Sequence, residues 1–377
     1  MAIEIRKVAT RGDLRKFIRF NYQLYKDSPY AVPELYSDMV ATLSKDKNPA
    51  FEFCEADYFL AYKDGRLVGR VAAIINRRAN ERWGKRQVRF GWIDFIDDEQ
   101  VSSALIAAVE QWGSQRGMTE VVGPLGFTDF DPEGMLVEGF DQLGTMSATY
   151  NYEYYSRHIE RMGFGQDAEW VEMKVFVPDA IPEKHLRIAE IVKKKYNLQV
   201  KKYKSGKRIA KDYGQQIFDL MNLAYRDLYG FSELSPRQVQ LYIKTYLPIL
   251  DLDFLTLITD AEGKLVGVGI TMPSLSVALQ KAKGRYFPFG WWHLLKALFI
   301  SKPKVIDFLL VAVHPDYQGK GVNALLFTDL IPIYQRKGVQ YAETNPELAA
   351  NAKVQSQWQY FDQQLHKRRR SYVKPIG

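Results

Sequence analysis

Val305-Ile-Asp-Phe-Leu-Leu-Val-Ala-Val-His-Pro-Asp-Tyr-Gln-Gly-Lys-Gly-Val322 is the stretch of this 377-residue chain that decides the fold. Its first nine residues are apolar apart from one aspartate, which predicts a buried strand. His-Pro-Asp-Tyr predicts a turn, and two glycines then lead into a helical apolar pattern that begins at Val322. Glycines leave backbone amides uncovered, and a helix N-terminus carries a partial positive charge. We therefore predict that this corner binds a pyrophosphate.

The bulk composition bounds the class of protein. With 377 residues the chain is longer than a single hydrophobic core usually supports, so two domains are expected. With 46% hydrophobic and 25% charged residues it has a globular composition. The single cysteine, Cys54, rules out an intramolecular disulfide. The N-terminus lacks the apolar core of a signal peptide, and the longest apolar block, 287–300, is too short to span a bilayer. We expect a cytoplasmic protein.

The formal net charge is +8, and basic residues concentrate at 77–89, 193–208 and 366–370. Such runs are compatible with a solvated surface, an anionic cofactor or substrate, or nucleic acid. The sequence has no zinc-finger spacing, RNP-like motif or helix-turn-helix pattern, so no nucleic-acid partner is expected. No metal site is predicted.

Two segments of the chain repeat one plan. A strand, a turn and a second strand occur around Asp64-Gly65 and again around Glu262-Gly263, and the two glycines are 198 residues apart. Gly117 and Gly338, each between a helical pattern and a strand, are 221 residues apart. The longer second offset indicates an insertion after the second hairpin, at about 273–300.

Each half is predicted to contain an opening strand, one or two helices, a hairpin, a strand, a helix, a strand, a helix and a closing strand. The predicted fold class is α/β (α+β), in which each half forms a mixed, mostly antiparallel twisted sheet flanked by helices. We predict domains at 1–177 and 198–377, joined by a linker helix at 178–197. The helical insertion belongs to the second domain.

The corner resembles the signature of the GNAT superfamily of N-acetyltransferases, a strand followed by Gln/Arg-x-x-Gly-x-Gly/Ala at the start of a helix. Here the pattern falls on Gln318 to Asn323, and Asn323 departs from it because glycine or alanine is usual there. The resemblance covers 198–377 well and 3–177 more weakly. It implies tandem GNAT-like halves, the first degenerate and the second using acetyl-CoA or another acyl-CoA, without a metal.

The resemblance also implies residue roles. A backbone amide of the strand before the corner would meet the acyl carbonyl, and the pantetheine arm would run between this strand and the one at 339–344. The family tyrosine that protonates the leaving thiolate would fall seven residues after Asn351, where this chain has Trp358. Tyr360 is the remaining candidate acid, although it faces another side of a helix. The implied cofactor-binding residues are Val311, Ala312, Val313, Gln318, Gly319, Lys320, Gly321, Val322, Asn323 and Asn351.

The implied reaction is direct attack of an amine on the thioester, which requires a general base. Glu343, at the end of the strand at 339–344, is our candidate, although a strand-end carboxylate in solvent is an equal alternative. Asp307 and His314 are weaker candidates, because a salt bridge and a turn explain them as well. The expected partner is a small-molecule or peptide amine.

A dinucleotide-binding motif competes with this interpretation. Gly319 to Ala324 also fits Gly-x-Gly-x-x-Ala, with Glu343 about twenty residues further on. That motif normally begins directly after its strand and opens its domain. Here His314 to Gln318 intervene, and only 34 residues follow Glu343. We therefore discount it.

The first half is expected to supply a wall of the acceptor pocket and no second cofactor site. Its equivalent corner, Asp97 to Gln100, has no glycine, and its carboxylates repel phosphate. Acids and aromatics at 127–132 and 150–155 suit a cationic amine, although loop packing also explains them. The apolar block at 287–300 is expected to be an interdomain packing helix, with a membrane-surface helix or an acyl pocket as alternatives. We expect no membrane partner.

The resulting hypothesis is an acyl-CoA-dependent N-acyltransferase, with acetyl-CoA as the first candidate. A Fem-type aminoacyl or peptidyl transferase that uses aminoacyl-tRNA is one alternative, because those enzymes duplicate this fold and 193–208 is basic. A catalytically silent ligand-binding protein of GNAT-like fold is the other, because of Asn323 and Trp358. The oligomeric state is not predicted.

Overall fold

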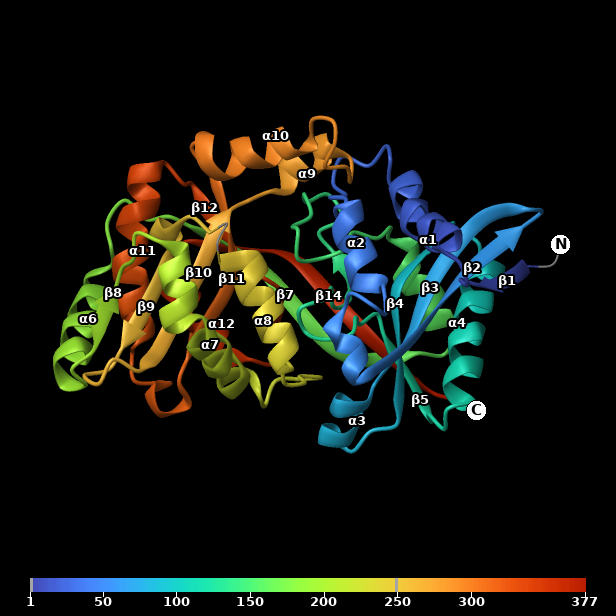
Figure 1. The fold of residues 1–377 in the computed structure, drawn as a ribbon, viewed down its shortest axis with the longest axis horizontal. Helices are drawn as coiled ribbons and strands as arrows, with labels where there is room; N and C mark the ends of the chain where they lie inside the picture. The colour runs from blue at the N-terminus through green and yellow to red at the C-terminus, as the bar shows by residue number, and fades with distance from the viewer. Residues whose placement is uncertain (1–2, 248–249) are drawn as a thin grey trace.

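One twisted sheet runs through the whole molecule (Figure 1). The computed structural model describes residues 3–247 and 250–377. The strands are β1 (Ile3–Lys7), β2 (Cys54–Lys63), β3 (Arg66–Asn76), β4 (Gln87–Phe95), β5 (Glu120–Gly123), β6 (Met135–Glu138), β7 (Gly165–Phe176), β8 (Gln199–Lys201), β9 (Leu255–Thr259), β10 (Leu265–Pro273), β11 (Val305–Val313), β12 (Tyr341–Glu343), β13 (Glu347–Leu348) and β14 (Gln363–Pro375). Their order is β1-β2-β3-β4-β5-β14-β7-β12-β11-β10-β9-β8, with β6 beside β14 and β13 beside β7.

Helices flank this sheet on both faces (Figure 1). They are α1 (Arg11–Leu24), α2 (Tyr36–Leu43), α3 (Arg77–Trp83), α4 (Glu99–Ser114), α5 (Tyr154–Arg161), α6 (Glu183–Lys195), α7 (Gly206–Tyr225), α8 (Pro236–Tyr246), α9 (Ser276–Ala282), α10 (Gly290–Leu295), α11 (Asn323–Lys337) and α12 (Ala352–Gln355), with the π-helix η4 (Lys296–Ile300) and the 3-10 turns η1 (Pro49–Glu52), η3 (Leu252–Phe254), η5 (Pro315–Tyr317) and η6 (Ser356–Tyr360). Among the strand pairs of the described chain, β4–β5 and β11–β12 are parallel and the others antiparallel. The predicted mixed, mostly antiparallel sheet flanked by helices is confirmed.

The two halves repeat one element order. The β2–β3 hairpin is followed by β4, α4 and β5, and the β9–β10 hairpin by β11, α11 and β12. The hairpin turns place Gly65 and Gly263 at φ of 74° and 82°, a region that glycine occupies without strain. Gly69 of β3 and Gly269 of β10 lie under the two helices, since a Cβ there would approach Leu105 to 2.8 Å and Leu326 to 3.3 Å.

Helices α9 and α10 and the π-helix η4 occupy 276–300, the stretch predicted as an insertion. They connect the halves at one end of the molecule (Figure 1). Gln280 Nε2 donates to the carbonyl oxygens of Pro29 and Ala31 at 2.8 and 3.1 Å. The Tyr36 amide donates to the Gly284 carbonyl at 2.9 Å. The inner side of this segment therefore packs between the halves.

The last strand of each half crosses into the other half. β14, the C-terminal strand, lies between β5 and β7, while β7 also pairs with β12. Lys367 Nζ and Arg369 Nε on β14 reach the Glu172 carboxylate on β7 at 3.0 and 2.6 Å, and all three side chains are almost completely buried. Burial alone would raise the pKa of Glu172, but the two cations outweigh it and lower the pKa to about 2.

Replacing Glu172 with glutamine should lower the free energy of unfolding by about 3–5 kcal/mol, because two buried cations lose their counter-charge. The matched control is Glu138→Gln, because Glu138 pairs with Arg368 at 3.2 Å but its side chain is 62% exposed. This substitution should lower the free energy of unfolding by less than about 1 kcal/mol. Urea unfolding measures both variants. The stability that Glu172 contributes is fully present above the pKa that Glu172 has in the unfolded chain, near 4.5. This stability is lost as the pH falls from 4.5 through the folded-state pKa of about 2. Equal stability of the two variants would contradict this role.

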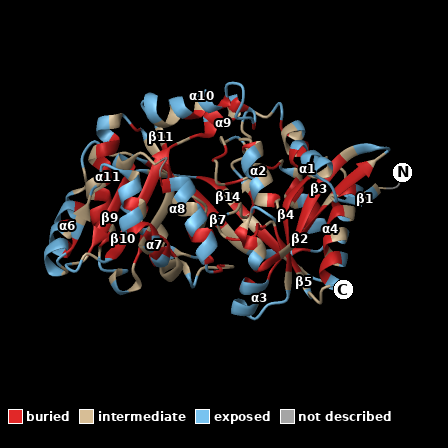
Figure 2. Cartoon of the chain, viewed as in Figure 1, coloured by how far each residue is buried: buried red, intermediate tan, exposed pale blue. Residues whose placement is uncertain are grey.

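The core follows the sheet. Buried residues line the inner strands, whereas the edge strands β1 and β8 have none, and exposed residues lie on the outer faces of the helices (Figure 2). In the first half, α4 buries Val101, Leu105 and Val109 against the sheet. In the second half, α11 buries Leu326 and Leu330 in the same way. This packing fixes where each helix begins relative to the strand before it.

Candidate active site

Strands β11 and β12 pair over three residues and then part. Their register runs from Val305–Tyr341 to Asp307–Glu343. Beyond this point the β12 chain stays with β7, because Thr344 exchanges two 3.0 Å hydrogen bonds with Met173 and β13 also pairs with β7. β11 stays with β10 as far as Val313. The backbones of 308–313 and 344–348 are therefore not paired with each other, and we call the gap between these two backbones the opening.

Asn345 spans the narrow end of this opening. Its Nδ2 donates to the Leu309 carbonyl at 3.0 Å, and its Oδ1 accepts from Ser147 Oγ of the first half at 3.1 Å. Leu309 lies at a β-bulge, because the β10 register passes from Leu310 to Phe308 and leaves it without a partner. A bulge disrupts the ladder locally and re-aims the backbone. This point of β11 is therefore suited to meet a substrate carbonyl.

The glycine corner follows β11 and η5, and α11 begins at Asn323. Within the described part of the chain, the amides of Gly319, Gly321, Val322 and Asn323 donate to no protein acceptor. Gly319 has φ of 71°, and a Cβ there would meet no atom within 4 Å, so the corner is open on that side. Uncommitted amides at a helix N-terminus bind anions. The corner thus fits the phosphates of an acyl-CoA.

Two side chains of the corner form specific hydrogen bonds. Gln318 Nε2 donates to the Val313 carbonyl at 3.0 Å and so fixes the turn against the end of β11. Asn323 Nδ2 donates to Gln357 Oε1 of η6 at 3.0 Å. The residue that departs from the family signature therefore links the start of α11 to the segment after α12.

Helix α6 packs beside the corner. A Cβ on Gly321 would approach Ile188 of α6 to 2.6 Å, and its φ is 82°, so packing and backbone conformation both require glycine there. Lys320 Nζ lies 5.3 Å from the ring centroid of Tyr196, which follows α6. The stretch predicted as a linker helix thus forms one side of the corner.

Val311, Ala312 and Val313, for which the GNAT resemblance implies contact with the cofactor, form the end of β11. Ala312 and Val313 pair with β10 and are buried. The Val311 carbonyl accepts from Tyr225 Oη of α7 at 2.9 Å. Burial and the charge of Glu347 raise the pKa of Tyr225 to about 12, although the hydrogen bond to Val311 lowers it. The hydroxyl of Tyr225 therefore keeps its proton at neutral pH.

Glu347 lies on the other limb of the opening, at the start of β13. Burial raises the pKa of Glu347 to about 7, although Trp358 Nε1 donates to its two carboxylate oxygens at 3.0 and 3.2 Å and lowers it. Trp358 is 3% exposed and packs on Phe308 of β11 and Phe327 of α11. Burial thus gives Glu347, on this limb, a pKa near neutral, and such a pKa suits a general base.

Glu343, the base predicted from the sequence, lies at the closed end, where β11 and β12 still pair. It is 6% exposed, and its Oε1 lies 3.7 Å from His366 Nε2. Burial and the charge of Glu343 raise the pKa of the neighbouring Asp307 to about 7. Burial lowers the pKa of His366 to about 3, so this imidazole is neutral at pH 7. Glu343 is thus enclosed among titratable groups.

The remaining predicted site residues lie elsewhere. Tyr360 is 47% exposed, and its hydroxyl hydrogen-bonds with Lys184 of α6. Asn351 caps α12, because its Oδ1 accepts from the Val354 amide at 3.3 Å. The expectation that Tyr360 lies on a helix that begins before Asn351 is wrong: β13 pairs with β7 first, the Asn351 cap starts α12 only at residue 352, and Tyr360 lies in the 3-10 turn η6. The catalytic role of Tyr360 and the cofactor contact of Asn351 stay predictions.

The equivalent corner of the first half is filled by the chain itself. β4 and β5 also pair over three residues, but Leu125 then donates to the Phe90 carbonyl at 2.9 Å, where the second half has its opening. Asp98 caps α4 by accepting from the Gln100 amide at 2.9 Å. This arrangement favours the second half as the cofactor-binding half.

A cavity of about 490 Å³ lies between the halves. It is lined by residues at 21–34 and 146–150 of the first half and 279–283 of the insertion. Met146 and Ala148 belong to its wall, and Ser147 between them bonds Asn345 at the opening. Leu309 packs against the apolar cluster that contains Leu279. Packed side chains therefore connect the wall of the cavity to the bulge of β11.

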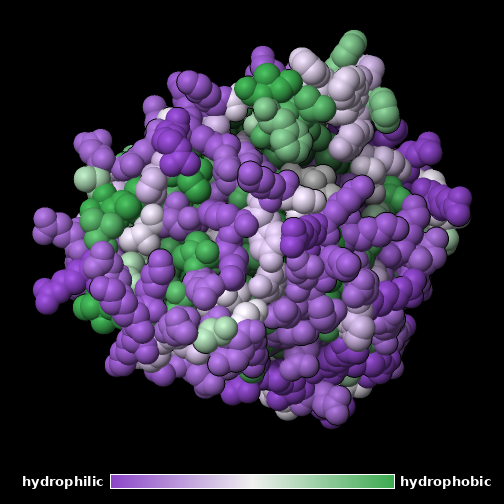
Figure 3. Space-filling view, turned by 60° about the vertical axis from the view of Figure 1, so that its left-hand side comes forward, coloured by the Kyte–Doolittle hydropathy of each residue, from purple (hydrophilic) through white to green (hydrophobic). Residues whose placement is uncertain are grey.

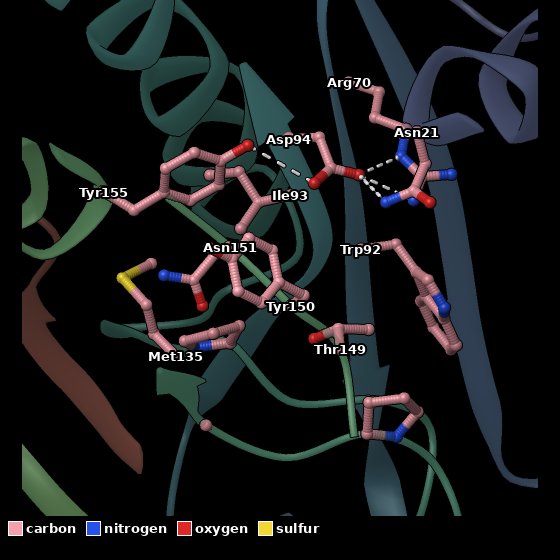
Figure 4. A pocket seen from close by; sticks show the side chains of 13 residues that line it. Asn21, Arg70, Trp92, Ile93, Asp94, Met135, Thr149, Tyr150, Asn151 and Tyr155 are labelled. Carbon is pink, nitrogen blue, oxygen red and sulfur yellow. Dashed lines mark hydrogen bonds and ion pairs between the residues drawn. The ribbon is translucent and has the colours of Figure 1, made fainter. Parts of the chain in front are cut away.

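A second cavity, of about 30 Å³, adjoins it in the first half (Figure 4). Figure 4 shows Asp94 at its edge, bonded by Asn21 Nδ2 at 3.0 Å, Arg70 Nε at 2.7 Å and Tyr155 Oη at 3.3 Å. Its size suits a single water molecule, so the network is structural. In residues 3–247 and 250–377, no three His, Cys, Asp or Glu side chains are grouped as metal ligands.

Sequence reasoning missed Asn345, Glu347 and Tyr225. A two-residue strand such as β13 has no periodicity, so nothing in the sequence marks Glu347 as lining an opening. Tyr225 is one of 23 tyrosines and lies 86 residues from the carbonyl it bonds. Asn345 followed by Pro346 indicates a turn in the sequence. Nothing in the sequence indicates that the Asn345 side chain bonds both Leu309 and Ser147.

Comparisons with known proteins agree with this architecture. No protein-family profile matches the sequence. "Protein YghO" of Escherichia coli is 27% identical over 99% of this chain and 95% of its own length. A "bacterial ceramide synthase" of Caulobacter vibrioides is 26% identical over 82% of this chain and 80% of its own. A tandem GNAT protein from the clavulanic acid biosynthesis pathway superposes with a TM-score of 0.56 over 100% of this chain and 99% of its own, at 13% identity. The chain therefore has a tandem GNAT fold.

Proposed function

We propose that this protein is an acyl-CoA-dependent N-acyltransferase whose second half carries the reaction. The observation that carries the proposal is the opening between β11 and β12 directly beside the uncommitted amides of Gly319, Gly321 and Val322. An acyl-CoA would supply an activated thioester carbonyl. The corner amides would hold its phosphates, and the backbone of β11 near Leu309 would face the acyl group.

Glu347 is our candidate general base. An amine arrives mostly as ammonium and must lose a proton before it attacks. Glu347, with a pKa of about 7, accepts that proton at neutral pH more readily than an ordinary carboxylate. Tyr225 holds the Val311 carbonyl and so keeps the end of β11 in place. Glu343 is less suited, because it lies among Asp307 and His366 at the closed end.

For the acceptor we propose an amine that carries a hydrocarbon chain. The relative named a ceramide synthase supports this, since a ceramide is a long-chain amino alcohol whose nitrogen bears a fatty acyl group. The cavity between the halves has an apolar part and a carboxylate, Glu34, whose pKa burial raises to about 7. The apolar wall suits the alkyl tail of such an amine, whose nitrogen would lie at Glu347. The same cavity has room for an acyl group longer than acetyl.

The purified protein should release free CoA from an acyl-CoA only when an amine is present, and mass spectrometry should detect the amide. We expect a long-chain amino alcohol to be a better acceptor than a small diamine or a peptide amine, and long-chain acyl-CoA to be a better donor than acetyl-CoA, because the cavity is partly apolar. Thiol release across this panel is the measurement. No binding of any acyl-CoA in calorimetry would reject the proposal, and activity that requires aminoacyl-tRNA would replace it by the Fem-type alternative.

A further inference from the structure

The segment 286–300 exposes an unusual amount of apolar surface. The eight side chains concerned form what we call the aromatic face: Tyr286, Phe287, Phe289, Trp291, Trp292, Leu295, Phe299 and Ile300. Phe287, Phe289 and Phe299 are 76%, 70% and 59% exposed. With Val277, this short stretch holds nine of the eighteen exposed large hydrophobic side chains of the described residues. Figure 3 shows hydrophobic side chains gathered at this end of the molecule.

The helical segment is apolar on both sides. Its inner side buries Leu294 and packs Ala297 and Leu298 on Leu275 and Leu279. The expectation of an interdomain packing helix therefore describes the inner side of 287–300. The outer side is covered by no part of the described chain. A contiguous exposed apolar patch on a water-soluble surface marks an interaction site.

The charged side chains of the segment that carries the aromatic face all have one sign. Between Glu262 and Asp307 the sequence contains no acidic residue. The cations that flank the face are exposed and form no ion pair with the described residues: Lys281, Lys283, Arg285, Lys296, Lys302 and Lys304. A protein partner is normally met by a rim of mixed polar residues. Aromatic side chains with a purely cationic rim complement an anionic lipid surface, where tryptophan rings lie at the headgroup level.

We propose that the aromatic face docks the protein on the surface of a bilayer that contains anionic phospholipid. No helix among the described residues is long and apolar enough to cross a membrane. Lying on the surface requires no such helix, so the short length of 287–300 does not oppose docking.

Docking would place the entrance of the substrate cavity at the lipid. Leu279 and Lys283, beside the aromatic face, line the cavity of about 490 Å³, and the apolar cluster of Leu279 extends to Leu309 on β11. An amphiphilic amine or acyl chain would then reach the opening without crossing water. This delivery step rests on the proposed function, whereas docking itself does not.

Co-sedimentation with vesicles tests the docking. The protein should bind vesicles of phosphatidylcholine and phosphatidylglycerol more tightly than vesicles of phosphatidylcholine alone, and added salt should weaken the binding. The variant Phe287→Ser/Phe289→Ser/Phe299→Ser should bind about 10-fold or more weakly, because three apolar side chains no longer enter the interface. Lys296→Glu/Lys302→Glu/Lys304→Glu should lose the preference for the anionic lipid.

The control is Ile191→Ser/Leu241→Ser, which removes exposed apolar side chains from α6 and α8 and should leave vesicle binding unchanged. Circular dichroism and calorimetry with acyl-CoA check that each variant is folded and keeps its cofactor corner. Equal vesicle binding by the triple serine variant, or no binding to anionic vesicles at low salt, overturns the proposal. It also falls if the serine variant turns an oligomer into a monomer without changing vesicle binding, since the face would then be a protein interface. Vesicle binding without acyl-CoA binding would reject only the proposed function.

Discussion

Glu347→Gln should lower kcat/KM for the amine about 100- to 10,000-fold, the range expected when a general base is removed. Glutamine keeps the shape of the side chain and accepts the hydrogen bond from Trp358, which lies at 3.0 Å, so the fold and the affinity for acyl-CoA should be preserved. Steady-state thiol release measures the rate, and calorimetry measures the affinity. A loss of both together would indicate a structural role instead.

The pH profile identifies the base more specifically. Because the pKa of Glu347 is raised to about 7, the active carboxylate form is lost as pH falls through that value, and kcat/KM should fall with it. Glu347→Gln should abolish this limb of the profile. Trp358→Phe removes the hydrogen bond that favours the carboxylate, so the limb should move to higher pH. A limb near pH 7 that persists in Glu347→Gln would contradict the assignment.

Glu343→Gln tests whether the general base is Glu347, which we chose from the structure, or Glu343, which we chose from the sequence. Glu343 lies at the closed end of the opening, with His366 at 3.7 Å. If Glu347 is the base, Glu343→Gln should change kcat/KM much less and leave the limb near pH 7 in place. The opposite pattern, a large loss only in Glu343→Gln, would return the role to Glu343.

Gly319→Glu should weaken acyl-CoA binding about 100-fold, or about 2.7 kcal/mol. A carboxylate placed at the start of α11 competes with the phosphates for the uncommitted amides and repels their charge. Gly319 is a better site for this test than Gly321, because a side chain at 319 meets no atom within 4 Å, whereas one at 321 meets Ile188 at 2.6 Å. Isothermal titration with acyl-CoA gives the dissociation constants.

Gly338→Glu is the matched control. Gly338 lies at the other end of the same helix, has φ of 77° and also has open space around it. Both substitutions place glutamate at a left-handed position, so both incur the same backbone strain. Only the one at 319 should weaken binding. An equal effect of the two variants would show that strain, and not the corner, controls affinity.

The sequence predicted those features that depend on neighbouring residues. The strand–turn–glycine–helix corner, the two hairpins and the duplicated element order are all local patterns, set by periodicity and by the conformational freedom of glycine. The structure places β11 at the predicted 305–313 and starts α11 at Asn323, one residue after the predicted Val322. The antiparallel pairing within the two hairpins follows from the short turns at Gly65 and Gly263, because a short turn can join only antiparallel strands.

Features that depend on distant residues were decided by the tertiary structure. The sequence predicts a closing strand for the second half but cannot say that β14 pairs with β5 and β7, because the hydrogen-bonding groups of the backbone are the same at every position. The pKa of Glu347 depends on burial against Trp358, eleven residues away, and on the parting of β11 and β12. The apolar pattern at 287–300 likewise fits burial or a surface equally well. Only packing on α9 determined which side chains were left exposed, because burial is a property of the assembled fold and not of the local chain.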